Sequence, residues 1–165
     1  MCRLLGGLFA RCGVLPRGHV VEVGAAELVG EHVGSETNRQ VKQAADRAEG
    51  GGLFIDEMYP LAPQNKDDML NKQALEELLG IATDPVRRLV IVGAGDPEQM
   101  REMFATANAG LRSRFPVILV LRPYEAIGLA HIFLHMATAN WCMDCTSLPL
   151  PWLRDAFDSM PVGMR

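Results

Sequence analysis

The sequence lacks the features that would direct it to a membrane, to nucleic acid or to a disulfide-bonded fold. Its apolar stretches are interrupted by glycine, proline or charge well short of the length that spans a membrane. Lys and Arg number 16 against 20 acidic residues, so the net charge of −4 shows no basic excess that would favour nucleic acid or an anionic membrane. Four cysteines without a regular framework are typical of a reducing compartment.

These absences leave a chain of 165 residues, 48% apolar, that can bury one core and a small appendage. We expect it in the cytoplasm or an organelle interior. The first ten residues resemble a signal peptide only faintly, because their apolar run is short and no small-residue cleavage site follows before Arg11. We interpret them as a buried helix.

Short apolar runs alternate with longer amphipathic ones along the chain. The expected strands are residues 19–23, 53–55, 88–92 and 115–121, and the expected helices are 35–49, 67–81, 97–107 and 124–139. Apolar strands that alternate with helices predict an α/β fold, with a parallel sheet covered by helices on both faces. Pro149, Pro151 and Pro161 argue against a helix in the tail, residues 141–165.

An acidic pair, Asp56 and Glu57, ends the apolar strand at residues 53–55. In a parallel sheet, ligands bind beyond the carboxyl ends of the strands. Asp56 would hold a nucleotide-bound Mg²⁺ from a rigid strand end, and Glu57 would polarise the water that attacks the nucleotide. The alternative is a buried strand that ends in solvated acids.

Several ordered segments carry a family resemblance that covers roughly residues 3–138. They are residues 18–21, 27–34, 51–57, 73–76 and 108–115. Together they resemble the AAA+ branch that holds the red-type Rubisco activases, the stage V sporulation K-like proteins and the type VII secretion ATPases. The resemblance implies a P-loop NTPase core, ATP and Mg²⁺ as ligands, a hexameric ring and a protein client that the ring remodels. It divides the chain into a large α/β subdomain (1–122), the start of a helical lid (123–140) and a divergent tail (141–165).

The resemblance also implies roles for single residues. Arg114 would be the arginine finger that reaches the nucleotide of a neighbouring subunit, and Arg112 is a second candidate for this role. Without the family, both would be read as a surface pair that flanks a strand. The segment His32, Val33 and Gly34 stands where the family has a pore loop, with histidine in place of an aromatic residue that grips the client.

The strand at residues 88–92 runs into Gly93-Ala94-Gly95-Asp96, where the family has a polar residue that senses the γ-phosphate. Asp96 is the only polar candidate, and an acid is electrostatically unsuited to a phosphate. We interpret this segment as a turn.

The phosphate-binding loop of the family has no counterpart. The chain contains no Gly-x-x-x-x-Gly-Lys-Ser/Thr motif and no Gly-Lys pair. In the family this loop, and the central strand that leads into it, precede the helix that corresponds to residues 1–12. We therefore expect unpaired strand edges, unless the neighbouring strands close on each other or on a partner, and no ATP hydrolysis by the chain alone. Two hypotheses remain: a fragment of an active ATPase, or a degenerate scaffold that binds partners without hydrolysis.

A rival site lies near the C-terminus. His131 and His135 are four residues apart on an expected helix, and Cys142 and Cys145 follow. Two histidines and two cysteines suffice for a tetrahedral zinc site. The alternatives are two lid-surface histidines and a CxxC redox pair, although no thioredoxin-like context precedes the cysteines.

Overall fold

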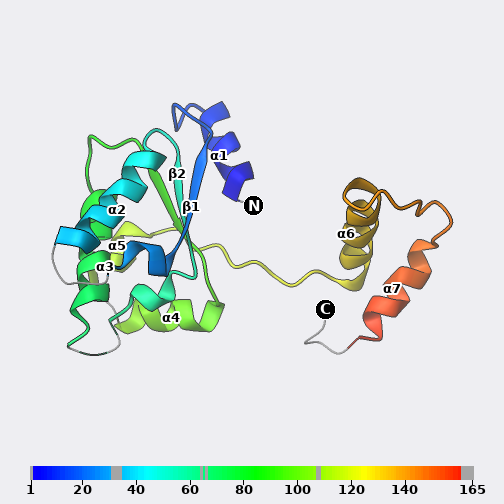
Figure 1. The fold of residues 1–165 in the computed structure, drawn as a ribbon. Helices are drawn as coiled ribbons and strands as arrows, with labels where there is room; N and C mark the ends of the chain where they lie inside the picture. Colours follow the sequence, from blue (N-terminus) through cyan, green and yellow to red (C-terminus); the bar gives the residue numbers. More distant parts are fainter. Residues whose placement is uncertain (1, 31–34, 64, 66, 107–108, 161–165) are drawn as a thin grey trace. The chain divides into compact units, whose positions relative to one another are not determined.

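The structure, a computed structural model, describes residues 2–30, 35–63, 65, 67–106 and 109–160. Its contacts divide the chain into two compact units, Met1–Ile118 and Leu119–Arg165. The first unit contains α1 (Cys2–Arg11), β1 (Val20–Gly24), η1 (Ala25–Leu28), α2 (Ser35–Ala48), β2 (Gly52–Asp56), η2 (Tyr59–Leu61), α3 (Met69–Ala82), β3 (Val90–Gly93), α4 (Pro97–Thr106) and α5 (Ala109–Arg114) (Figure 1). The second unit contains α6 (Ala126–Ala139) and α7 (Leu150–Asp158).

The three strands form one parallel sheet in the order β1-β2-β3. Val20 lies opposite Gly52 in the register, and Gly52 lies opposite Val90. The predicted α/β class and the parallel sheet are therefore confirmed. Seven of the expected helices and strands lie within about two residues of their observed bounds, which is the usual uncertainty of element ends.

The alternation of side chains along the strands explains how helices cover the sheet. Val23, Leu53 and Ile55 point to one face and are buried in the main apolar core, together with Val41 and three alanines of α2. The small alanine side chains let α2 lie close to the sheet, and α3 packs beside α2 (Figure 1). The core therefore lies between the sheet and these two helices.

The N-terminal helix covers β1 from the opposite face. Arg3 of α1 donates a hydrogen bond to Glu22 over 2.9 Å, and Gly6 lies so close to Val20 that an added Cβ would meet Cγ2 at 2.5 Å. Leu4 and Leu8 are 79% and 54% exposed. The expectation of a buried helix is wrong, because only one stripe of α1 packs against the sheet.

The fourth expected strand, residues 115–121, is not a strand. Residues Val117–Leu121 are extended without a ladder partner and are 61–75% exposed. Strand formation depends on pairing as well as on β-prone residues, and no described strand pairs with the second edge of β3. The absence of the family's central strand was expected to leave unpaired strand edges unless the neighbouring strands paired with each other. In the described residues, residues 117–121 do not pair with β3, and that edge of β3 is unpaired.

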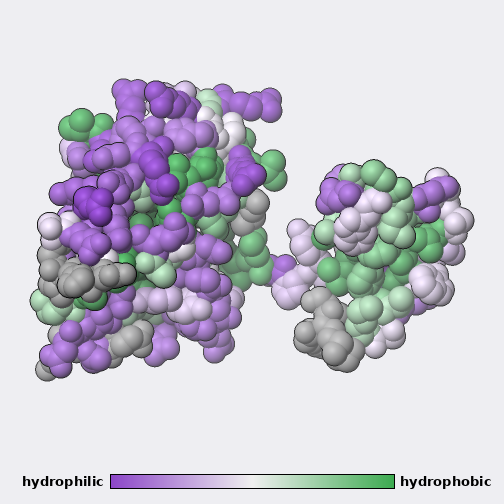
Figure 2. All heavy atoms as spheres, viewed as in Figure 1, coloured by the Kyte–Doolittle hydropathy of each residue, from purple (hydrophilic) through white to green (hydrophobic). Residues whose placement is uncertain are grey.

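The second unit is a pair of helices with a small interior. Phe133 of α6 makes edge-to-face ring contacts with Trp141 and with Phe157 of α7. Large apolar side chains remain on its surface, among them Trp152 and Ile132. Hydrophobic residues, drawn in green, cover much of the visible face of this unit (Figure 2). No described helix is both long enough and apolar enough to cross a membrane.

Helix α7 corrects the expectation drawn from the prolines of the tail. Pro149 precedes the helix as its cap, and Pro151 lies within the first turn. The missing N–H of a proline has no intrahelical partner in the first turn anyway, so proline is tolerated there.

Candidate functional site

Parallel strands bring their carboxyl ends to one edge of the sheet, and the acidic pair lies at that edge. β1 ends at Gly24, which is paired with Asp56 at the end of β2, and β3 ends at Gly93. Asp56 and Glu57 are both exposed. The strand itself is anchored by the fully buried Leu53 and Ile55, so the two carboxylates stand on a rigid support.

Glu57 has a left-handed backbone conformation, with φ of 49°. The next residue explains why the chain must turn here. The side chain of Met58 is fully buried, and its N–H donates a hydrogen bond to the carbonyl of Ala94 over 2.8 Å. A non-glycine residue in this region of backbone space costs about 1–3 kcal/mol, and such strain clusters at functional sites.

Tyr59 connects the acidic pair to the end of β3. The interaction of its hydroxyl with the Glu57 carboxylate is the main reason why the pKa of Tyr59 is raised; burial and the nearby negative charges of Glu57 and Asp96 add to the effect. The Tyr59 ring also lies against Gly95, where an added Cβ would approach Cδ1 to 2.9 Å. Tyr59 was not predicted from the sequence, because its contacts depend on how η2 packs against the segment after β3.

The segment after β3 has a structural role that agrees with its interpretation as a turn. Asp96 Oδ1 accepts hydrogen bonds from the N–H groups of Glu98 and Gln99, over 2.9 and 3.1 Å. These are donors of the first turn of α4, so Asp96 caps that helix.

A cleft of about 570 Å³ adjoins the acidic pair. Its walls are the ends of β1 and β2, η1, η2 and one residue of α3; the lining residues are Gly24, Ala25, Ala26, Val29, Asp56, Glu57, Pro60, Leu61 and Asn71. Arg112 and Arg114 are exposed on α5 and do not line this cleft. The Arg114 guanidinium donates a hydrogen bond to the carbonyl of Gly110 over 3.0 Å. Within one chain, the structure therefore places the acids together and the arginines elsewhere.

The remaining predicted sites receive no support from the geometry. His32, Val33 and Gly34 lie outside the described residues. Cys142 is exposed and Cys145 is buried, and the described residues contain no group of three or more His, Cys, Asp or Glu side chains that could hold a metal ion. The described residues therefore give no support to a zinc site that would include His131 and His135.

Comparison with known proteins finds relatives over most of the chain. Stage V sporulation protein K of Bacillus subtilis (strain 168) is 35% identical over 132 residues, which are 80% of this chain and 40% of that protein. Protein CbbX of Cereibacter sphaeroides is 37% identical over 133 residues, 80% of this chain and 42% of that protein. The chloroplastic ribulose bisphosphate carboxylase/oxygenase activase of Cyanidioschyzon merolae (strain NIES-3377 / 10D) is 37% identical over 115 residues, 69% of this chain and 38% of that protein. The chain thus spans about two fifths of the length of these relatives. No family model matches it.

Proposed function

Because the chain belongs with the AAA+ ATPases of the stage V sporulation protein K and red-type Rubisco activase branch, we propose that it carries the water-activating half of an ATP-hydrolysing site that drives remodelling of a protein partner. Asp56 would hold the Mg²⁺ of a bound nucleotide, and Glu57 would orient and polarise the attacking water. ATP and Mg²⁺ are the proposed ligands, and a hexameric ring is the proposed assembly.

The observation that carries this proposal is the strained Glu57 beside Asp56 at a strand end. The chain must turn at Glu57 to bury Met58, and glycine would make this turn without steric strain, so a glutamate there favours a role for its side chain. The exposed Glu57 lines the same cleft as Asp56, where a hydrolytic water would have to be held.

The arginine role requires a second subunit. Arg114 does not line the cleft of its own chain, which suits a residue that would stabilise the charge on a nucleotide bound by a neighbour. Arg112, on the same short helix, is proposed only as a second contact to phosphate.

This sequence contains no loop of the kind that binds nucleotide phosphates. The sequence holds no Walker A loop, and such loops supply the backbone N–H groups and the lysine that bind the phosphates. We therefore expect a polypeptide of this sequence to show no ATPase turnover by itself.

A chimera tests the proposal. A Walker A strand and loop joined before residue 1 should restore Mg²⁺-dependent ATP hydrolysis, and Glu57→Gln should reduce its kcat at least about 100-fold while leaving nucleotide binding intact, because general-base catalysis typically contributes that much. Asp56→Asn should weaken Mg²⁺ binding, so that a higher Mg²⁺ concentration is needed for half-maximal hydrolysis. Hydrolysis by the unjoined chain that Glu57→Gln abolishes would show that the loop is dispensable. A chimera that binds ATP but keeps its rate after Glu57→Gln would refute the role of Glu57.

A further inference from the structure

The aromatic ring of Tyr59 lies against the turn that follows β3, close to helix α4. An added Cβ at Gly95 would meet Cδ1 of Tyr59 at 2.9 Å and the sulfur of Met100 in α4 at 3.2 Å. Tyr59 is half-buried and packs against the main apolar core. The ring is therefore held in one place, and the glycine leaves the space that the ring occupies.

The backbone around Glu57 is fixed on both sides by one residue. Ala94 donates a hydrogen bond from its N–H to the carbonyl of Ile55 over 2.9 Å, and its own carbonyl accepts one from the N–H of Met58 over 2.8 Å. Glu57 lies between these two bonds and is exposed. Its Cα is therefore held in place, whereas its carboxylate can still rotate unless another group binds it.

The Tyr59 hydroxyl is the group that reaches this carboxylate. It interacts with two side chains that have opposite effects on the pKa of Tyr59: Glu57 raises this pKa, and Gln99 of α4 lowers it. A carboxylate can only accept a hydrogen bond, whereas the amide of glutamine can donate one. The two effects therefore correspond to a hydroxyl that donates to Glu57 and accepts from Gln99.

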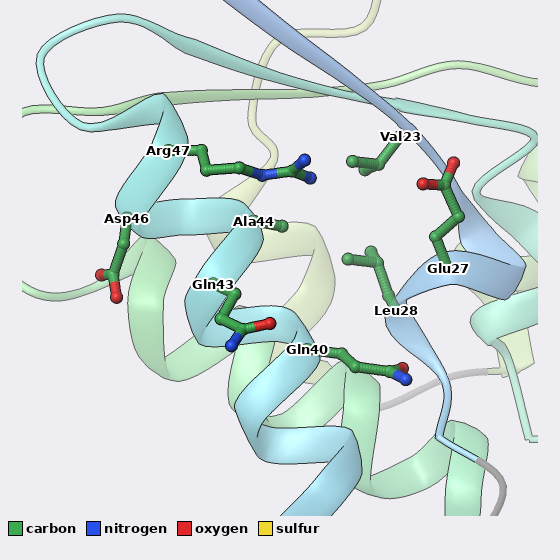
Figure 3. A pocket seen from close by; sticks show the side chains of 8 residues that line it. All are labelled: Val23, Glu27, Leu28, Gln40, Gln43, Ala44, Asp46 and Arg47. Carbon is green, nitrogen blue, oxygen red and sulfur yellow. The ribbon is translucent and has the colours of Figure 1, made fainter.

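A second glutamate at the same edge of the sheet is held in a different way. Glu27 lies beside Val23 and Leu28, in a groove next to α2 that shares no lining residue with the acidic cleft (Figure 3). Its carboxylate accepts a hydrogen bond from the backbone N–H of Gly24 over 2.8 Å. Glu27 is thus oriented by the backbone of its own turn, whereas the Glu57 carboxylate depends on a tyrosine side chain.

We propose that Tyr59 is a positioning residue of the acidic cleft: its hydroxyl holds one oxygen of the Glu57 carboxylate and leaves the second oxygen free to accept a hydrogen bond from water. This inference rests on the proposed function of Glu57. Packing alone does not account for the hydroxyl, because phenylalanine would fill the same space against Gly95. A carboxylate whose orientation is set in advance needs no reorganisation when the water is bound.

The rate of ATP hydrolysis by the Walker A chimera tests this role. Tyr59→Phe should lower kcat about tenfold and leave the KM for ATP unchanged, because it removes one hydrogen bond to a charged group that acts on the water and not on the nucleotide. Tyr124→Phe is the matched control. Tyr124 is 66% exposed and does not line the acidic cleft, so the loss of its hydroxyl should have no effect.

Gly95→Ala tests the geometry without a change to Tyr59 itself. The backbone of Gly95 is not left-handed, so the new methyl group acts through its contact with the ring, which it should displace from Glu57. We expect kcat to fall about tenfold in this variant too, because the same hydrogen bond is lost. Gly80→Ala, in α3, is the control, since a Cβ added there meets nothing within 4 Å.

NMR spectroscopy of the full chain tests the contact directly and needs no hydrolysis. The chain has two tyrosines, so an isotopic label at Cζ in a Tyr124→Phe background reports on Tyr59 alone. Glu57→Gln should lower the pKa of Tyr59, because it removes the main cause that raises it, and Gln99→Leu should raise that pKa further. Glu27→Gln removes the same charge from the other glutamate and should leave the pKa of Tyr59 unchanged.

The proposal is overturned if the pKa of Tyr59 does not respond to Glu57→Gln and Gln99→Leu in these opposite directions. It is also overturned if Tyr59→Phe keeps the full rate in a chimera that Glu57→Gln inactivates. A chimera that keeps its rate after Glu57→Gln instead refutes the proposed function of Glu57, and with it the catalytic purpose of the contact.

Discussion

Glu57 occupies a backbone conformation that glycine adopts more readily than any other residue. The conformation is imposed from outside, by the burial of Met58 and its hydrogen bond to Ala94. Because this conformation strains a residue that has a side chain, the presence of glutamate there favours a role for the carboxylate.

Glu57→Gly should therefore stabilise the chain. The relief of strain exceeds the entropy that glycine loses on folding, so we expect the free energy of unfolding to rise by about 0.5–1 kcal/mol. Urea denaturation of the first unit measures this change. Glu57→Ala is the control, because alanine keeps the strained conformation and should give no gain. A Glu57→Gly variant no more stable than Glu57→Ala would mean that Glu57 is not strained.

Features that involve single residues were the hardest to predict from the sequence. The position of Asp56 and Glu57 at a strand end could be predicted, because a short apolar run followed by acids indicates it. The contact of Tyr59 with Glu57 and Gly95 could not, since it depends on how η2 packs against the segment after β3. The burial of Met58 is a tertiary effect of the same kind.

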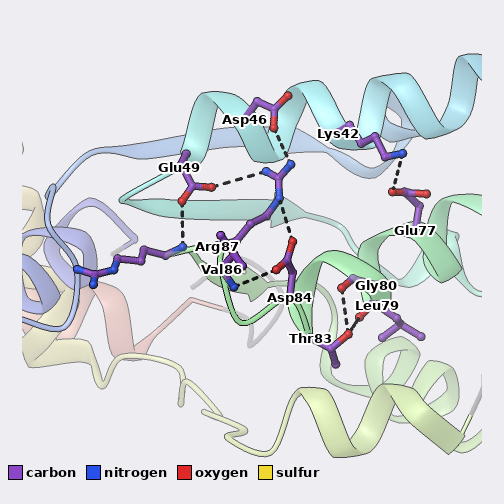
Figure 4. Close-up of polar contacts among 11 residues, drawn as sticks. Lys42, Asp46, Glu49, Glu77, Leu79, Gly80, Thr83, Asp84, Val86 and Arg87 are labelled. Atoms are coloured by element: carbon purple, nitrogen blue, oxygen red, sulfur yellow. Dashed lines mark hydrogen bonds and ion pairs between the residues drawn. The ribbon is translucent and has the colours of Figure 1, made fainter.

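Among the elements, α2 is tied to the loop before β3 by one arginine (Figure 4). Arg87 forms ion pairs with Asp46 over 2.8 Å, with Glu49 over 3.6 Å and with Asp84 over 3.9 Å. Glu49 also accepts a hydrogen bond from the N–H of Arg88 over 2.9 Å. The Arg87 side chain is only 23% exposed, so its charge is screened less than that of a free surface arginine.

Arg87→Met should lower the free energy of unfolding by about 1 kcal/mol, since a network of three carboxylates exceeds an isolated surface pair. The loss should shrink as salt is added, because part of it is electrostatic. Arg101→Met is the matched control: Arg101 makes a single exposed pair with Glu98 over 3.4 Å and should contribute little. Equal losses for the two variants, or a loss independent of salt, would contradict this account.

Periodicity predicted the elements whose partners are close in sequence, and it failed where the partner is distant. The pattern of α2 and α3 was sufficient, because each helix buries its apolar residues in the main core. Residues 117–121 have the composition of a strand, but a strand needs a neighbour that the described sheet does not supply. Helix α7 was not predicted, because Pro151 was interpreted as a helix breaker. It lies in the first turn of the helix, where proline is tolerated.

On the scale of the whole molecule, five consecutive apolar residues, Val117–Leu121, are exposed between Phe115 and α6. Such a segment is β-prone and uncharged, which is the signature of an aggregation site. We expect the chain to associate as its concentration rises. Val120→Lys should shift that association to higher concentration, as measured by sedimentation velocity, whereas Val86→Lys, at an isolated exposed residue, should not. A chain that stays monomeric at all concentrations would show that the segment is harmless.

The central claim is that Glu57 of one chain and Arg114 of another act on the same nucleotide. The most direct test is the ATPase rate of a mixture of two inactive chimeras, one with Glu57→Gln and one with Arg114→Ala, each joined to a Walker A loop. Loss of an arginine finger costs about 10³-fold or more in kcat, so each variant alone should be nearly inactive while still binding ATP. The mixture should regain activity, because some interfaces combine an intact Glu57 with an intact Arg114. A mixture as inactive as its components, or an Arg114→Ala variant that no longer binds ATP, would contradict the claim.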